Sequence, residues 1–133
     1  MDNAIVFDSF ALIAHFEDEE RGAKVTSVLK RAQTGTLTIY MSVINFGEVY
    51  YITMRERGNE KAEEILMLTK QLPIKIVNPD MEATVAAAKL KAKYPLAYAY
   101  CFAAALAKSK SLPVMTGDPE FKRFEDEVKI LWI

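Results

Sequence analysis

The sequence has few of the residues that build covalent cross-links or histidine-based sites. Cys101 is the only cysteine and His15 the only histidine among 133 residues. A single cysteine excludes a disulfide framework and a cysteine-based zinc site, and a single histidine excludes a histidine-rich metal site. We therefore expect a reducing, cytoplasmic setting. We also expect Cys101 to lie in the core and His15 to have a structural role at a helix end.

Long apolar runs and an excess of positive charge are also missing. The longest apolar runs, residues 4–7 and 101–107, are far too short to cross a bilayer, so no membrane association is expected. No basic segment follows Met1, so we expect no secretory signal. Lys and Arg total 17 against 18 for Asp and Glu, a net charge of −1. A nucleic-acid ligand would therefore need a local basic patch or a metal.

The composition is that of an ordinary globular protein, with 51% hydrophobic and 26% charged residues, which excludes intrinsic disorder. No repeat, low-complexity segment or Pro/Gly/Ser-rich linker divides the chain. We therefore predict a single domain over residues 1–133, because this length lies within the commonest range for one domain.

Apolar patterning predicts strands that alternate with helices. Strands are expected at residues 4–7, 36–41, 74–77, 113–116 and 128–132. Helices are expected at 9–16, 17–32 and 97–108, after caps at Ser42, Asn59 and Asp80, and briefly at 120–124. In the Asn59 helix, residues 62, 65, 66 and 68 are expected to be buried. This order predicts an α/β fold with three layers, α/β/α, around a parallel sheet of four to five strands.

Three acids end or interrupt apolar segments. Asp8 ends the first strand, Asp118 lies just past the fourth, and Glu48 has mainly apolar neighbours on its helix. Ligands of parallel sheets bind beyond the carboxyl ends of the strands, so Asp8 and Asp118 share a cleft if their strands are neighbours. Clustered carboxylates repel, and Mg²⁺ or Mn²⁺ would relieve that repulsion. Each acid also has a purely structural interpretation, as a helix cap or an exposed side chain.

Four stretches occur in a characteristic order: VFDSFALIA at residues 6–14, NFGEVYY at 45–51, YPLAYAYCFAAA at 94–105 and TGDPEF at 116–121. Together they resemble the PIN domain, and within it the VapC-type toxins of toxin–antitoxin pairs. The resemblance implies a PIN-like fold and a Mg²⁺- or Mn²⁺-dependent endoribonuclease. Asp8, Glu48 and Asp118 would be the catalytic and metal-binding acids, with Ser9, Asn45 and Thr116 as supporting polar groups. It also implies an RNA substrate, a cognate antitoxin and a homodimer.

One position departs from the family pattern, because Tyr100 stands where the family has an aspartate. A phenol with a reference pKa near ~10 stays neutral at pH 7, so one negative charge is lost. General-base effects of roughly 10²–10⁴ are at stake, and we expect weak or absent activity. Three explanations for Tyr100 are open. In the first the chain is a natural degenerate copy, and in the second the substitution was selected or engineered during expression. In a third explanation the remaining acids, helped by Glu120 or Asp2, still hold one metal.

Two other functions stay open. A PIN-like fold without catalysis would serve as a binding module for an antitoxin or RNA. A small nucleotide- or phosphate-binding domain is disfavoured because no glycine-rich loop follows the first strand. Basic residues are candidate phosphate contacts and tyrosines candidate stacking partners for bases, although solvated helix faces for the basic residues and core or dimer contacts for the tyrosines are the preferred explanations. These residues are Arg55, Arg57, Lys61, Lys89, Lys91, Lys93, Lys108, Lys110, Tyr50, Tyr51, Tyr98 and Tyr100.

Overall fold

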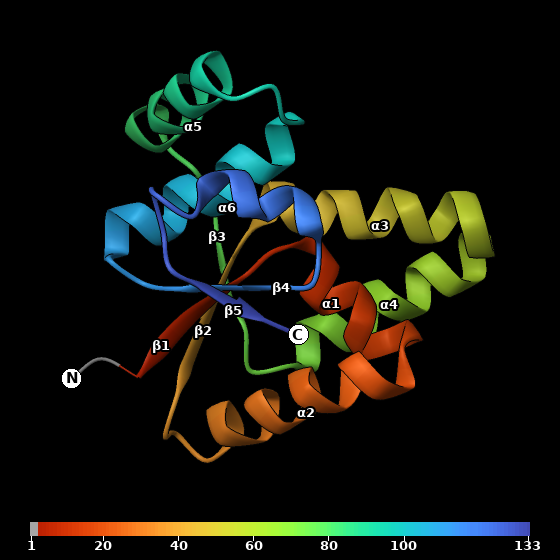
Figure 1. Ribbon diagram of the computed structural model, residues 1–133. Coiled ribbons are helices and arrows are strands. Elements are labelled where there is room, and N and C mark those ends of the chain that lie inside the picture. The colour runs from red at the N-terminus through yellow and green to blue at the C-terminus, as the bar shows by residue number, and fades with distance from the viewer. Residues whose placement is uncertain (1–2) are drawn as a thin grey trace.

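A parallel sheet lies between two layers of helices in the computed structural model, which describes residues 3–133 (Figure 1). The strand order is β3-β2-β1-β4-β5, and all four neighbouring pairs are parallel. The strands are β1 (Ala4–Phe7), β2 (Thr38–Ser42), β3 (Lys75–Val77), β4 (Val114–Thr116) and β5 (Ile130–Trp132). The predicted three-layer α/β/α fold with a central parallel sheet is therefore confirmed.

Each face of the sheet is covered by its own group of helices. One core contains α1 (Ser9–Glu17), α2 (Glu19–Gln33), α3 (Val43–Arg57) and α4 (Asn59–Gln71). The other contains α5 (Met81–Lys93), α6 (Tyr98–Lys110) and the 3-10 helix η1 (Pro119–Phe124). Side chains alternate along β1, so Ile5 and Phe7 enter the first core and Val6 the second. This burial on both faces explains why β1 is a continuous apolar run.

The predicted helix caps are correct in two cases and wrong in one. The side chains of Ser42 and Asp80 accept backbone N–H bonds at the starts of α3 and α5. Asn59 was expected to cap α4, but it is the first helical residue and Gly58 takes the cap position with φ +93°. Glycine adopts this φ without strain, which allows α3 to end and α4 to begin at one residue. Leu68 is 39% exposed rather than buried, because only one face of α4 packs on the core.

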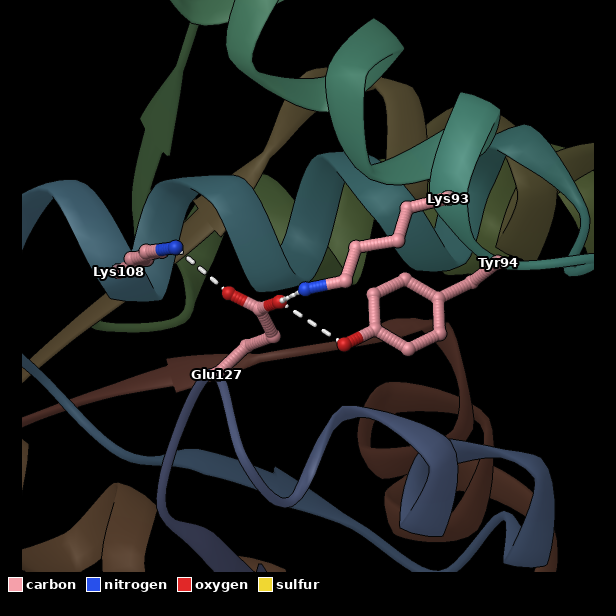
Figure 2. Close-up of polar contacts among 4 residues, drawn as sticks. All are labelled: Lys93, Tyr94, Lys108 and Glu127. Carbon is pink, nitrogen blue, oxygen red and sulfur yellow. Dashed lines mark hydrogen bonds and ion pairs between the residues drawn. The ribbon is translucent and has the colours of Figure 1, made fainter.

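Glu127, in the segment between η1 and β5, joins two helices of the second layer (Figure 2). Its Oε1 accepts a bond from the Lys108 ammonium at 2.6 Å, and its Oε2 accepts from Lys93 at 3.0 Å and from the Tyr94 hydroxyl at 2.8 Å. These bonds, led by that from Lys108, lower the pKa of Glu127 to about 2. We call these four residues the Glu127 clasp. Lys93 and Lys108, two of the candidate phosphate contacts, are thus paired with the carboxylate of Glu127.

Within residues 3–133, no helix combines the length and apolar character needed to span a membrane. Cys101 is fully buried, as expected. His15 lies in α1, and its Nδ1 is 2.9 Å from the hydroxyl oxygen of Thr26 in α2, so its visible role is to join two helices.

Candidate active site at the carboxyl edge of the sheet

The direction of the strands brings the predicted site residues to one edge of the sheet. Asp8 follows β1 and caps α1, whereas β2 passes directly into α3 and places Asn45 and Glu48 in the first two turns of that helix. Thr116 ends β4, and Asp118 caps η1. Because β1 and β4 are neighbours, the condition for a shared cleft between Asp8 and Asp118 is met.

Asp8 is a buried acid without a cationic partner among the ion pairs of the described residues. It is 3% exposed, and its Oδ1 accepts the backbone N–H of Ala11 at 2.9 Å. Burial raises the pKa of Asp8 to about 7, the Thr116 hydroxyl and the Ala11 N–H oppose this rise, and the charges of Asp118 and Glu48 add to it. The helix-cap interpretation of Asp8 is therefore correct, and the same carboxyl is electrostatically coupled to the two other acids.

Ser9 and Asn45 connect three helices beside these acids. The Ser9 hydroxyl donates to the backbone carbonyl of Asn45 at 3.1 Å. The Asn45 amide nitrogen donates to the Ser9 hydroxyl oxygen at 3.3 Å and to the carbonyl of Ala99, in α6, at 3.0 Å. Asn45 Oδ1 is buried and has no hydrogen-bond partner in the part of the chain that is described. The contact with Ala99 fixes the first turn of α6, which carries Tyr100, against α3.

Tyr100 occupies the space among the acids and bonds to one of them. Its hydroxyl donates to Oδ2 of Asp118 at 2.6 Å. The other oxygen of Asp118 accepts the backbone N–H of Glu120 at 3.0 Å, and the N–H of Asp118 donates to the Thr116 hydroxyl oxygen at 3.0 Å. Burial raises the pKa of Tyr100, and so do its bond to Asp118 and the charges of Glu48 and Glu120. The phenol is therefore neutral and keeps its proton while it donates a hydrogen bond to the neighbouring carboxylate.

The residues do not form a preassembled metal centre. Carboxylate oxygens suit Mg²⁺ and Mn²⁺, but no three His, Cys, Asp or Glu side chains between residues 3 and 133 are grouped closely enough to hold a metal ion. Both oxygens of Asp118 already accept hydrogen bonds. The proposed compensating acid Glu120 is exposed, and Asp2 lies outside the described residues. As arranged, this donor set does not fit a bound cation.

Sequence reasoning missed one aromatic contact at this edge. The ring of Phe10, which follows Asp8 by two residues, lies against Gly117, next to Asp118. A Cβ at Gly117 would be only 2.4 Å from that ring, so glycine is required for the contact. Both residues lie in stretches that carry the resemblance, and a glycine directly before an acid was the available signal.

Comparison with protein families shows the family to which this chain belongs. The model of the PIN domain matches residues 5–127, nearly the whole chain. The chain belongs to the PIN domain family. A comparison with curated protein sequences gives no match. Membership in this nuclease family is consistent with a cluster of acids at the carboxyl edge.

Solved structures of VapC proteins share the PIN fold of this chain. VapBC2 from Rickettsia felis, bound to a promoter DNA fragment, has a TM-score of 0.76 at 14% identity, covering 96% of this chain and 97% of that one. DNA-bound VapBC from Salmonella typhimurium has a TM-score of 0.72 at 16% identity and covers 98% of both chains. VapC20 from Mycobacterium tuberculosis, described as a toxin that cleaves the sarcin–ricin loop, has a TM-score of 0.69 at 13% identity, covering 90% and 93%. At these identities the likeness shows that the PIN fold is shared.

Proposed function

We propose that this PIN chain has the fold and acids of a VapC-type endoribonuclease, which hydrolyses RNA phosphodiesters with Mg²⁺ or Mn²⁺. We further propose that Tyr100 impairs this activity. The observation that carries the proposal is the hydrogen bond from Tyr100 to Asp118, at 2.6 Å, within the group of acids that includes Asp8 and Glu48. The acids are those that the family resemblance assigns to metal binding. The phenol takes an oxygen that a cation would need.

The electrostatics explain why one substitution is enough to disable such a site. A divalent cation positions water and stabilises the charge that develops during phosphodiester cleavage. Asp8 is half-protonated near pH 7 when no cation is present. Replacing the family aspartate by Tyr100 removes a further charge and adds a donor to Asp118. Each change lowers the affinity of the site for a cation.

The test compares the unmodified chain with Tyr100→Asp and Tyr100→Phe on a pool of structured RNAs with Mg²⁺ and with Mn²⁺. We expect only Tyr100→Asp to cleave, by roughly 10²–10⁴ above the unmodified chain, and EDTA to stop it. Tyr100→Phe removes the hydroxyl that bonds to Asp118 but restores no carboxylate. It therefore distinguishes the effect of the blocked Asp118 oxygen from the effect of the missing acid. Asp118→Asn in the Tyr100→Asp background is the inactive control. Robust metal-dependent cleavage by the unmodified chain would overturn the proposal.

A second candidate is a binding module for an antitoxin or RNA that does not cleave. It is favoured because no three His, Cys, Asp or Glu side chains among residues 3–133 lie close enough together to hold a metal ion, and by the likeness to VapBC toxin–antitoxin complexes. Thermal unfolding of Tyr100→Asp with and without Mn²⁺ distinguishes the two, because a ligand at 100 times its Kd adds about 2.7 kcal/mol to the free energy of unfolding. No shift at millimolar Mn²⁺ supports the binding module. Either function implies an antitoxin partner, and a homodimer is proposed on the resemblance alone.

A further inference from the structure

Two arginines are each placed over an aromatic ring, one in α3 and one in α2. The guanidinium carbon of Arg55 is 5.2 Å from the centre of the Tyr51 ring in α3. The guanidinium carbon of Arg21, in α2, is 5.5 Å from the centre of the Phe10 ring in α1. Such pairs are held by attraction between the cation and the negative face of the ring. We refer to them as the two arginine–aromatic pairs.

The first pair continues the helix face that carries Glu48. Tyr51 and Arg55 follow Glu48 by three and seven residues, so the three side chains lie along one side of α3, at axial distances of about 4.5 and 10.5 Å from Glu48. The Tyr51 side of this face is open, with Tyr51 47% exposed and Ile44 39% exposed. An acid, an aromatic ring and a cation thus follow one another at about one helical turn.

The second pair lies on the other side of the acids. Phe10 is two residues from Asp8 in sequence, and its ring touches the backbone at Gly117, one residue before Asp118. Arg21 is an exposed residue in the first turn of α2, and its side chain reaches back over that ring. Phe10 therefore links Arg21 to the segment that carries Asp118, while Tyr51 links Arg55 to the helix face that carries Glu48.

Both arginines keep a charge that no neighbouring acid neutralises. Among the ion pairs formed by the described part of the chain, neither Arg21 nor Arg55 has a carboxylate partner. Arg57, close by on α3, pairs with Glu17. Lys93 and Lys108 both pair with Glu127. Several of the basic residues that sequence reasoning identified are thus paired with acids of the same chain. Arg55 and Arg21 remain available to an anion.

We propose that the two arginine–aromatic pairs bind single-stranded RNA on the two sides of the acidic edge. The arginines contact phosphates, and the exposed ring of Tyr51 and the guanidinium planes stack on bases. This inference deepens the proposed function and rests on RNA being the ligand. With a net charge of −1, the chain cannot hold RNA by its overall charge, so local contacts of this kind must supply the attraction.

The test measures binding of a fluorescein-labelled single-stranded RNA of about 12 nucleotides by fluorescence anisotropy, in EDTA, over a range of salt concentrations. Arg55→Gln and Arg21→Gln should each weaken binding and reduce the slope of log affinity against log salt by about 0.7. Tyr51→Ser should weaken binding by about tenfold and leave that slope unchanged. Arg31→Gln removes the same charge at the far end of α2 and is the matched control, with no change expected.

The inference is overturned if all four variants bind the RNA as tightly as the unmodified chain does, or if the unmodified chain shows no measurable binding. A dimer in light scattering that Tyr51→Ser dissociates without changing RNA affinity also overturns it, because the open face of α3 is then a protein interface. The proposed function fails separately. If Tyr100→Asp does not cleave while the arginine variants still weaken binding, the inference stands and the proposed cleavage falls. If Tyr100→Asp cleaves but the arginine variants bind RNA with unchanged affinity, the proposed cleavage stands and the inference falls.

Discussion

Glu127 and Asp8 are both largely removed from solvent, yet their surroundings move their pKa values in opposite directions. The Glu127 side chain is 9% exposed and receives hydrogen bonds from two ammonium groups and a hydroxyl, so its pKa falls to about 2. Asp8 is 3% exposed and has hydrogen-bond donors but no ion-pair partner among residues 3–133, and burial raises its pKa to about 7. The two carboxylates differ in whether the fold supplies positive charge.

This difference separates a structural cluster from a functional one. In the Glu127 clasp every partner comes from the chain itself, so the charge is satisfied when folding is complete. At the acidic edge the fold collects Asp8, Glu48 and Asp118, and no cationic side chain among residues 3–133 forms an ion pair with them, which leaves a site that gains from an external positive charge. A buried carboxyl whose pKa is raised beside other acids therefore points to function more strongly than a buried acid that is paired with cations of its own fold.

The largest expected effect comes from removing the charge of Asp8. Its folded pKa of about 7 exceeds the value of 3.8 for the free group, so the native state binds more protons between these limits and loses stability as the pH rises through them. The penalty reaches about 4 kcal/mol above pH 7. Asp8→Asn keeps a cap acceptor and should raise the free energy of unfolding near pH 8 but hardly near pH 4. Urea unfolding at both pH values measures this.

Asp80→Asn is the matched control for Asp8→Asn. Asp80 also caps a helix through one carboxylate oxygen, but it is exposed to solvent. A gain from Asp8→Asn that is equal at both pH values, or that Asp80→Asn reproduces, would contradict burial as the cause.

A smaller loss is expected from breaking the Glu127 clasp. Glu127→Gln should lower the free energy of unfolding at pH 7 by about 1–2 kcal/mol, a modest figure because Lys93 and Lys108 are 65% and 57% exposed. The lowered pKa of Glu127 means that its contribution is present above about pH 4.5 and is lost as the pH falls towards 2. The difference from the unmodified chain should therefore shrink in melts at acidic pH. Glu64→Gln, in the exposed pair with Lys61, should have little effect.

The smallest effect is expected from Tyr94→Phe, which removes one bond of the clasp. The ring stays packed edge-on against Phe124, with 5.0 Å between the ring centres, so only the 2.8 Å hydrogen bond to Glu127 is lost. We expect a decrease of about 0.5–1.5 kcal/mol in the free energy of unfolding, measured by thermal melting. Tyr98→Phe, at an exposed ring on α6, is the control. A loss as large as that from Glu127→Gln would show that the hydroxyl, rather than the lysines, dominates the clasp.

Sequence reasoning predicts the acidic edge better than the clasp, for a physical reason. A strand buried on both faces is a continuous apolar run, so Asp8 and Asp118 stand out where such runs end. Parallel strands then place their carboxyl ends together without further information. Glu127 lies in a segment without periodicity, and its partners at positions 93, 94 and 108 come from other elements. No local pattern indicates such a contact.

The same limit applies inside the candidate site. The departure at Tyr100 is visible in the sequence, but the bond to Asp118 depends on how α6 packs against β4 and η1. The missed cap at Gly58 has a different cause, because both glycine and asparagine are good cap residues and only the backbone shows which one is used.

The central position of β1 has a consequence for how the chain is made. Val6 pairs with Val114, so the first strand cannot complete its hydrogen bonds until the fourth strand has left the ribosome. Contacts this distant in sequence are slow to form, because a long loop must close before they are gained. Asp8 is synthesised 110 residues before Asp118 and meets it only after the fourth strand has emerged. The acidic edge is therefore among the last parts of a newly made molecule to assemble.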